Sequence, residues 1–142
     1  MIRQRFSIDM LLIKDIMCPH PLTVHASAMV REAKQIMSEH AIRHLPVIEG
    51  GKLKGIITDR DLKLAQAVSD NKEFDSSKKV GDICVCNVYV VDPKEHAKKV
   101  LAYMGKERIG SALVMENGDL VGIFTAVDAC KAFAGYLSQH DH

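Results

Sequence analysis

The order of apolar and polar residues predicts a helix followed by a two-stranded hairpin in the first half of the chain. One set of apolar side chains recurs at helical spacing: Met29, Val30, Ala33, Ile36 and Met37. Two short apolar runs follow at 45–48 and 53–57, and the stretch between them contains Gly50 and Gly51. Adjacent glycines favour a β-hairpin, because both central positions of a type I′ turn need positive φ. A second helix is expected to begin after Thr58.

The second half of the chain has the same order of elements. Apolar residues at helical spacing follow Asp92 and Pro93, which we interpret as the N-cap and first position of a helix: Ala97, Val100, Leu101 and Met104. Asn117 and Gly118 then separate two further apolar runs and predict a second hairpin. Another helix is expected after Thr125.

The similarity of the two halves extends to residue identities. At an offset of 67 positions, residues 14–62 align with 81–129 without a gap, with 13 identical pairs among 49, where chance would give about three. The agreement is densest in Gly55-Ile-Ile-Thr-Asp-Arg-Asp61 and Gly122-Ile-Phe-Thr-Ala-Val-Asp128. One copy of about 50 residues would be only marginally stable. We therefore expect two copies packed sheet to sheet in one compact α+β body with pseudo-two-fold symmetry.

Composition narrows the classes of partner. Nineteen Lys and Arg residues against eighteen Asp and Glu residues leave a formal charge of +1, which argues against binding of duplex nucleic acid or an anionic membrane. The absence of Trp argues against a base-stacking platform. The four cysteines include no C-x-x-C pair, and the apolar run near the N-terminus is only four residues long. We expect a cytoplasmic protein with reduced thiols and no membrane span.

A Thr-x-x-Asp pattern follows the second strand of each hairpin, and it has two interpretations. Thr58 with Asp61, and Thr125 with Asp128, have the spacing of a capping box, which needs no ligand. The same helix N-terminus also offers free amide groups to a phosphate or ribose oxygen, and the carboxylate can accept from a vicinal diol. Glycines that precede each pattern, Gly55 and Gly122, would let a planar ring approach the strand backbone.

Three motifs in order, repeated at one offset, resemble a tandem of cystathionine-β-synthase (CBS) domains, often called a Bateman module. The first copy carries Asp15-Ile-Met-Cys-Pro-His-Pro-Leu-Thr-Val24, Ile42-Arg-His-Leu-Pro-Val-Ile48 and Gly55-Ile-Ile-Thr-Asp-Arg-Asp-Leu62, and the second copy carries weaker forms of them. The resemblance covers residues 13–138. It implies two β-α-β-β-α repeats, at 13–68 and 80–138, joined by a polar linker at 69–79.

The resemblance implies a non-catalytic regulatory module that binds AMP, ADP, ATP or S-adenosylmethionine and signals to a partner protein, without a catalytic cofactor. In that family each of two clefts combines the Thr and Asp of one copy with residues of the other. Carried over, the first cleft comprises Thr125, Asp128, His20, Leu22, Thr23, Arg43 and His44. The second comprises Thr58, Asp61, Asn87, Tyr89, Val90, Gly110 and Ser111.

The two implied clefts differ in their residues. Arg43 and His44 of the first copy correspond to Gly110 and Ser111 of the second, which cannot neutralise a phosphate. The prolines before Thr23 have no counterparts before Val90, and Leu113 replaces Pro46. We expect the cleft with Asp128 to bind nucleotide better.

Other sequence features leave alternatives open. His40 with His44, and the terminal His140-Asp-His142, could contribute to a metal site, although Pro46 indicates that a helix has ended before His44. Cys84-x-Cys86 would place two thiols on one face of a strand, as a redox pair or metal ligands, but small buried side chains are the favoured interpretation.

Assembly and activity complete the expectations. The helical methionines are interpreted as core residues or as a dimer seam, and the resemblance implies a homodimer. The sequence has no nucleophile elbow, Walker A loop or H-E-x-x-H motif, so no enzyme is expected. The alternatives to ligand sensing are a constitutive dimeric scaffold with vestigial clefts and a thiol- or metal-binding protein.

Overall fold

The computed structural model describes residues 10–69 and 77–140. These residues form two compact units. The first unit is Pro21–Val88, and the second joins the segment that ends at His20 to the chain from Tyr89 onward. Each unit contains one copy of the repeat, and we describe each by itself.

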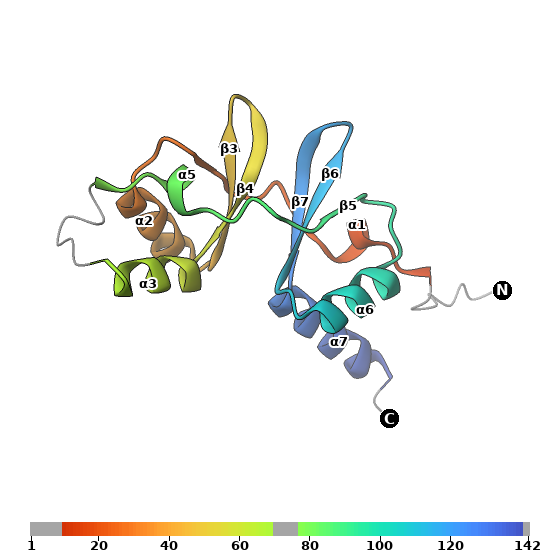
Figure 1. Ribbon diagram of the computed structural model, residues 1–142. Coiled ribbons are helices and arrows are strands. Elements are labelled where there is room, and N and C mark those ends of the chain that lie inside the picture. Colours follow the sequence, from red (N-terminus) through yellow and green to blue (C-terminus); the bar gives the residue numbers. More distant parts are fainter. Residues whose placement is uncertain (1–9, 70–76, 141–142) are drawn as a thin grey trace. The chain divides into compact units, whose positions relative to one another are not determined.

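The first unit holds a three-stranded sheet with helices beside it. Its sheet order is β2-β3-β4, with β2 parallel to β3 and β3 antiparallel to β4. Helices α2 and α3 lie next to each other on one side of the β3–β4 hairpin (Figure 1). The elements are β2 (Val24–His25), α2 (Val30–His40), β3 (His44–Glu49), β4 (Lys52–Thr58), α3 (Asp59–Ala67) and α5 (Val80–Ile83).

The second unit repeats this order with one additional strand. Its sheet order is β1-β7-β6-β5, with β5 parallel to β6 and β7 antiparallel to both β6 and β1. The elements are α1 (Ile13–Ile16), β1 (Cys18–Pro19), β5 (Val90–Val91), α6 (Ala97–Glu107), β6 (Ser111–Glu116), β7 (Asp119–Thr125) and α7 (Ala126–Gln139). The β-α-β-β-α order predicted for each copy is confirmed, whereas α1, β1 and α5 were not predicted.

Both hairpin turns have the predicted chemistry. Gly50 and Gly51 have φ of 59° and 75°, and Asn117 and Gly118 have φ of 52° and 84°. Positive φ at both central positions matches the right-handed twist of the flanking strands. The register of each hairpin is therefore determined by its turn. In the first hairpin, the first residue of β3, His44, lies opposite the last residue of β4, Thr58.

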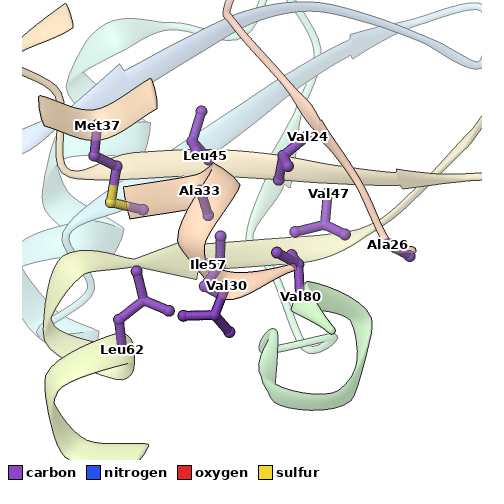
Figure 2. Packing of buried hydrophobic residues seen from close by; sticks show 10 residues of the cluster. All are labelled: Val24, Ala26, Val30, Ala33, Met37, Leu45, Val47, Ile57, Leu62 and Val80. Atoms are coloured by element: carbon purple, nitrogen blue, oxygen red, sulfur yellow. The ribbon is translucent and has the colours of Figure 1, made fainter. Parts of the chain in front are cut away.

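The core of each unit lies between its sheet and its helices. Figure 2 shows the cluster of the first unit, in which side chains from α2 and α3 contact the strands. Leu45 and Ile57 from the sheet, Val30 from α2 and Leu62 from α3 are almost completely buried. In the second unit Phe124 and Ile13 are fully buried. Met37 and Met104 are buried, which confirms the prediction that they are core residues, whereas Met29 is only half-buried.

Each unit is completed by a segment that belongs, in sequence, to the other copy. Helix α5 follows the linker, yet the amides of Val80 and Gly81 donate to the carbonyls of Ala28 and Ala26, both at 2.8 Å. Helix α1 begins the first copy, yet the Ile13 amide donates to the Glu95 carbonyl of the second copy at 2.9 Å. The compact units therefore do not follow the boundaries of the sequence repeats.

The start of α6 differs from the prediction. Asp92 and Pro93 do not cap this helix, which begins at Ala97 with His96 as its N-cap. The Asp92 carboxylate instead accepts from the Lys94 amide at 2.8 Å, which closes an Asx turn. The Asx turn uses the side-chain oxygen that an N-cap would use. Asp92 and Pro93 therefore begin the loop between β5 and α6, and the helix starts after this loop.

Two expectations fall partly on residues that are not described. Most of the predicted linker, 70–76, and the N-terminal nine residues lie outside the described ranges. Within those ranges, no helix combines the length and apolar character needed to cross a membrane.

Candidate functional site

The β7–α7 junction has a complete capping box. The Thr125 amide donates to Oδ2 of Asp128 at 2.9 Å, and the Thr125 hydroxyl donates to the same oxygen at 3.0 Å. The Asp128 amide in turn donates to the Thr125 hydroxyl oxygen at 3.3 Å. The Asp128 carboxylate is thus compatible with both interpretations of the motif, helix capping and ligand binding. Its Oδ2 caps the helix, and its Oδ1 accepts no hydrogen bond from the described residues.

The β4–α3 junction has only half of this arrangement. The Asp61 amide donates to the Thr58 hydroxyl oxygen at 3.1 Å. Within the described parts of the chain, the Asp61 carboxylate accepts no hydrogen bond, so its direction is set less firmly than that of Asp128. Two identical Thr-x-x-Asp patterns therefore give one carboxylate held in place and one that is not.

The residues beside each junction are set by the strand register. His44 lies opposite Thr58, and the Asp59 amide donates to the Arg43 carbonyl at 3.0 Å. In the second unit Ser111 lies opposite Thr125, and the Ala126 amide donates to the Gly110 carbonyl at 3.0 Å. In the first unit, residues 43–44 thus lie beside Thr58. In the second unit, residues 110–111 lie beside Thr125. The predicted combination of Arg43 and His44 with Asp128 joins residues of different units and stays a prediction.

The remaining predicted residues are divided between the units. Leu22 and Thr23 are exposed just before β2, and Asn87 is exposed near the end of the first unit. In the second unit His20 is exposed with φ of 51°, and its amide donates to the Val121 carbonyl at 3.2 Å. Val90 lies opposite Leu113 in the sheet.

Tyr89 makes an aromatic contact that the sequence did not predict. Its ring packs against Tyr103 of α6, with centroids 4.4 Å apart. Burial raises the pKa of the Tyr89 phenol, and the negative charge of Glu95 raises it further. Tyr89 thus stays protonated well above neutral pH and can act as a hydrogen-bond donor.

Gly55 and Gly122 occupy the same position in the two copies, and the space beside each is filled by the chain itself. A Cβ on Gly55 would lie 2.3 Å from the Val85 carbonyl oxygen, and a Cβ on Gly122 would lie 2.4 Å from Sδ of Met17. These glycines were predicted to admit a planar ring. They instead admit the segments next to Val85 and Met17, which pack on β4 and β7.

Cys86 is exposed and Cys84 is half-buried, so the interpretation of both as small buried side chains is wrong. Val85 between them bridges Ile56 at the edge of the sheet, which leaves this segment at the surface. Burial is the largest cause that raises the pKa of the Cys84 thiol, and the neighbouring Cys86 thiol adds to it.

The histidine metal-site alternative finds no support in the described ranges. His40 ends α2 and His44 begins β3, so the two are not on one helix. No group of three or more His, Cys, Asp or Glu side chains in 10–69 and 77–140 is arranged to hold a metal ion. His142 lies outside these ranges.

Comparison with known proteins identifies the repeat. The model of the CBS domain family matches two stretches of the chain, residues 13–67 and 80–135. The chain belongs to the CBS domain family. Its two copies are two CBS domains, and the α+β fold expected from the resemblance is confirmed.

Solved CBS-domain structures are similar over almost the whole chain. A crystal structure of a putative acetoin utilization protein (AcuB) from Vibrio cholerae has 30% sequence identity and a TM-score of 0.81, and covers 94% of this chain and 98% of that chain. The CBS domain pair of protein MJ0100, in complex with 5′-methylthioadenosine and S-adenosyl-L-methionine, has 32% identity and a TM-score of 0.79. The similarity covers 89% of this chain and 98% of that one.

Some curated relatives are enzymes that contain CBS domains as a small part. L-aspartate semialdehyde sulfurtransferase of Methanocaldococcus jannaschii is 36% identical over 126 residues. The match covers 87% of this chain but only 23% of that enzyme. The similarity therefore concerns the CBS domains and does not extend to the enzyme's remaining length.

Proposed function

We propose that this CBS domain protein is a regulatory module that binds an adenosine-containing ligand, of the class of AMP, ADP, ATP or S-adenosylmethionine, and signals to a partner protein. The observation that carries the proposal is the Thr125–Asp128 junction. There a half-buried carboxylate is fixed through Oδ2 while Oδ1 remains available.

The chemistry of this junction suits the ribose of a nucleoside. A carboxylate oxygen can accept from a vicinal diol, and each charge-assisted hydrogen bond contributes about 1.5–3 kcal/mol. Because the Thr125 hydroxyl and amide already orient the Asp128 carboxylate, little rotamer entropy is lost when a ligand binds. The N-terminus of α7 adds the positive end of a helix dipole.

The family resemblance supports a cleft that combines the two copies. In the proposed first cleft, Asp128 holds the ribose while Arg43 and His44 balance the charge of a phosphate. In the second, Asp61 has Gly110 and Ser111 in place of these cations. The solved CBS pair of MJ0100, which holds two adenosine compounds, supports the ligand class.

Calorimetric titration with AMP, ATP and S-adenosylmethionine tests the proposal. Asp128→Ala should lower the affinity for the ligand by roughly 10–100-fold, which is the effect of one lost charge-assisted hydrogen bond. Asp61→Ala is the matched control in the other copy and should change this affinity far less. Asp128→Asn keeps a side-chain oxygen that can cap the helix. This variant therefore distinguishes a loss of ligand binding from a loss of helix stability.

The outcomes distinguish the alternatives. An unchanged affinity in Asp128→Ala together with lost binding in Asp61→Ala would reverse the assignment of clefts. Absence of binding by every ligand at millimolar concentration, with the protein folded, would contradict ligand sensing and favour a constitutive scaffold.

Homodimerisation is the second part of the proposal. Helix α7 has no buried residue in its unit, and it exposes Val127, Phe133 and Leu137 by 61%, 58% and 50%. In the other unit Leu64 of α3 and Val68, the C-cap residue of this helix, are exposed. Apolar helix faces of this kind are typical of protein interfaces, and the resemblance implies that CBS pairs associate through their helices.

Sedimentation of Phe133→Glu tests this assembly. The wild-type protein should sediment as a dimer, and the variant should be monomeric at the same concentration, because a buried unpaired carboxylate opposes association. Leu101→Glu, at a 40% exposed position of α6, is the control and should remain dimeric. A monomeric wild-type protein would contradict the proposal.

A further inference from the structure

We propose that Cys84 and Cys86 form a two-thiolate binding site for a soft monovalent metal ion of the Cu(I) type. The site lies in the first unit, at the sheet edge next to β4. It is independent of the adenosine ligand and uses none of the residues proposed to bind it.

The backbone holds the two thiols on one side of an extended segment. The amide of Val85 donates to the Ile56 carbonyl at 2.8 Å, and its carbonyl accepts from the Ile56 amide at 2.9 Å. Cys84 has φ of −68° and ψ of 153°, which is extended. Because alternate residues of an extended chain point the same way, Cys84 and Cys86 share a face. The Cys84 thiol donates to the Gly81 carbonyl at 3.7 Å.

The close approach to Gly55 keeps this segment from moving toward the strand. The Val85 carbonyl carbon and oxygen and the Cys86 Cα occupy the space where a Cβ at position 55 would lie. The thiols are therefore held by a bridge and a backbone contact, and Cys86 is exposed to incoming ions. A site held this way loses little entropy on binding.

The geometry favours a bridging ion over a disulfide. In an extended chain, the Cα atoms of residues i and i+2 are about 6.6 Å apart. This distance is at the upper end of the roughly 4.4–6.8 Å between the Cα atoms of disulfide-bonded cysteines. Their Cβ atoms point in parallel and do not converge. A metal ion between the sulfurs spans this separation without breaking the Val85–Ile56 bridge.

The number of donors selects the type of ion. Zinc in structural sites takes four protein ligands, and the described ranges hold no cluster of three or more His, Cys, Asp or Glu side chains. Thiolates select soft ions, and Cu(I) accepts two of them. Binding releases both thiol protons to solvent, and no electron is transferred.

Lys54 supplies a positive charge beside the thiolates. It interacts electrostatically with both cysteines, while its Nζ lies 3.4 Å from Oε1 of Glu49. The ammonium thus contacts the Glu49 carboxylate and contributes a positive potential at the two thiols. It offsets part of the negative charge that two thiolates bring.

The second unit provides a natural comparison. At the 67-residue offset, Cys84, Val85 and Cys86 correspond to Met17, Cys18 and Pro19, and Cys18 occupies the bridging position opposite Ile123. The flanking residues there are not thiols. We therefore expect one site per chain.

Anaerobic titration of the reduced full-length protein with Cu(I), buffered by a bicinchoninate competitor, tests the site. One equivalent per chain should bind. Cys84→Ser and Cys86→Ser should each weaken binding by roughly 100-fold or more, because two linked donors bind far more tightly than one. Cys18→Ser and Cys130→Ser, at the other two exposed cysteines, should leave it unchanged.

Three results would overturn the inference. One is equal Cu(I) affinity in Cys86→Ser and the wild-type protein, with folding verified by circular dichroism. Another is loss of binding in Cys18→Ser or Cys130→Ser, which would assign the ion to a different set of thiols. The last is ready formation of a Cys84–Cys86 disulfide with glutathione disulfide, detected by mass spectrometry, because the extended geometry opposes it.

Discussion

Phe124→Ala is expected to lower the free energy of unfolding of the second unit by about 3–5 kcal/mol, the range found for large-to-small substitutions in cores. Phe124 is completely buried and has the largest volume of the fully buried side chains. It lies on β7, one residue before Thr125 of the candidate site. Loss of its ring removes packing against the helices and leaves a cavity beside the junction. Urea denaturation followed by circular dichroism measures the change.

Two further variants give the Phe124 experiment its control. Ile57→Ala alters the corresponding position of the first unit, also fully buried, and should cost about 2–5 kcal/mol there. Leu101→Ala, at a partly exposed position of the second unit, should cost about 1 kcal/mol or less. A loss in Phe124→Ala no larger than that in Leu101→Ala would contradict the described core.

Gly55→Ala is expected to destabilise the first unit by about 1–3 kcal/mol through overpacking. The new Cβ would meet the backbone carbonyl of Val85 at 2.3 Å. The nearest atoms all belong to the backbone of Val85 and Cys86, so no flexible side chain can move aside. The Val85–Ile56 bridge should open as a result. Amide hydrogen exchange should show faster exchange at Val85 and Ile56, along with a lower urea midpoint.

Gly122→Ala is the matched control at the same position of the other copy. There the Cβ would meet Sδ of Met17 at 2.4 Å, the far end of a flexible side chain that can change rotamer. We therefore expect a smaller loss of stability than in Gly55→Ala. Equal losses in the two variants would show that the Val85 contact is not the cause.

The elements with strong local signals were predictable from the sequence. The turns at Gly50-Gly51 and Asn117-Gly118 demand positive φ, and the helices α2 and α6 carry a clear apolar stripe over 11 residues each. The short elements α1, β1 and α5 were not predictable. They have two to four residues, too few for a periodic signal, and partners far along the chain stabilise them.

The candidate site was predictable in its residue types but not in its geometry. The Thr-x-x-Asp spacing correctly indicated capped helix starts, because the hydrogen bond from the third amide depends only on local backbone. Which carboxylate rotates back to the cap amide is a matter of side-chain rotamer, which two identical motifs do not distinguish. Likewise, the general tendency of cysteines to be buried failed at Cys86, because that segment pairs at a sheet edge.

The segments exchanged between the copies have a consequence for the order of folding during synthesis. The first unit is continuous from Pro21 to Val88, so it can fold as soon as that stretch has left the ribosome. The second unit contains Ile13, whose hydrogen-bond partner Glu95 comes 82 residues later, and closure of so long a loop carries a larger entropy cost. Because domains fold in order as the chain emerges, residues 13–19 have no partners in the second unit until the chain as far as β7 has been synthesised.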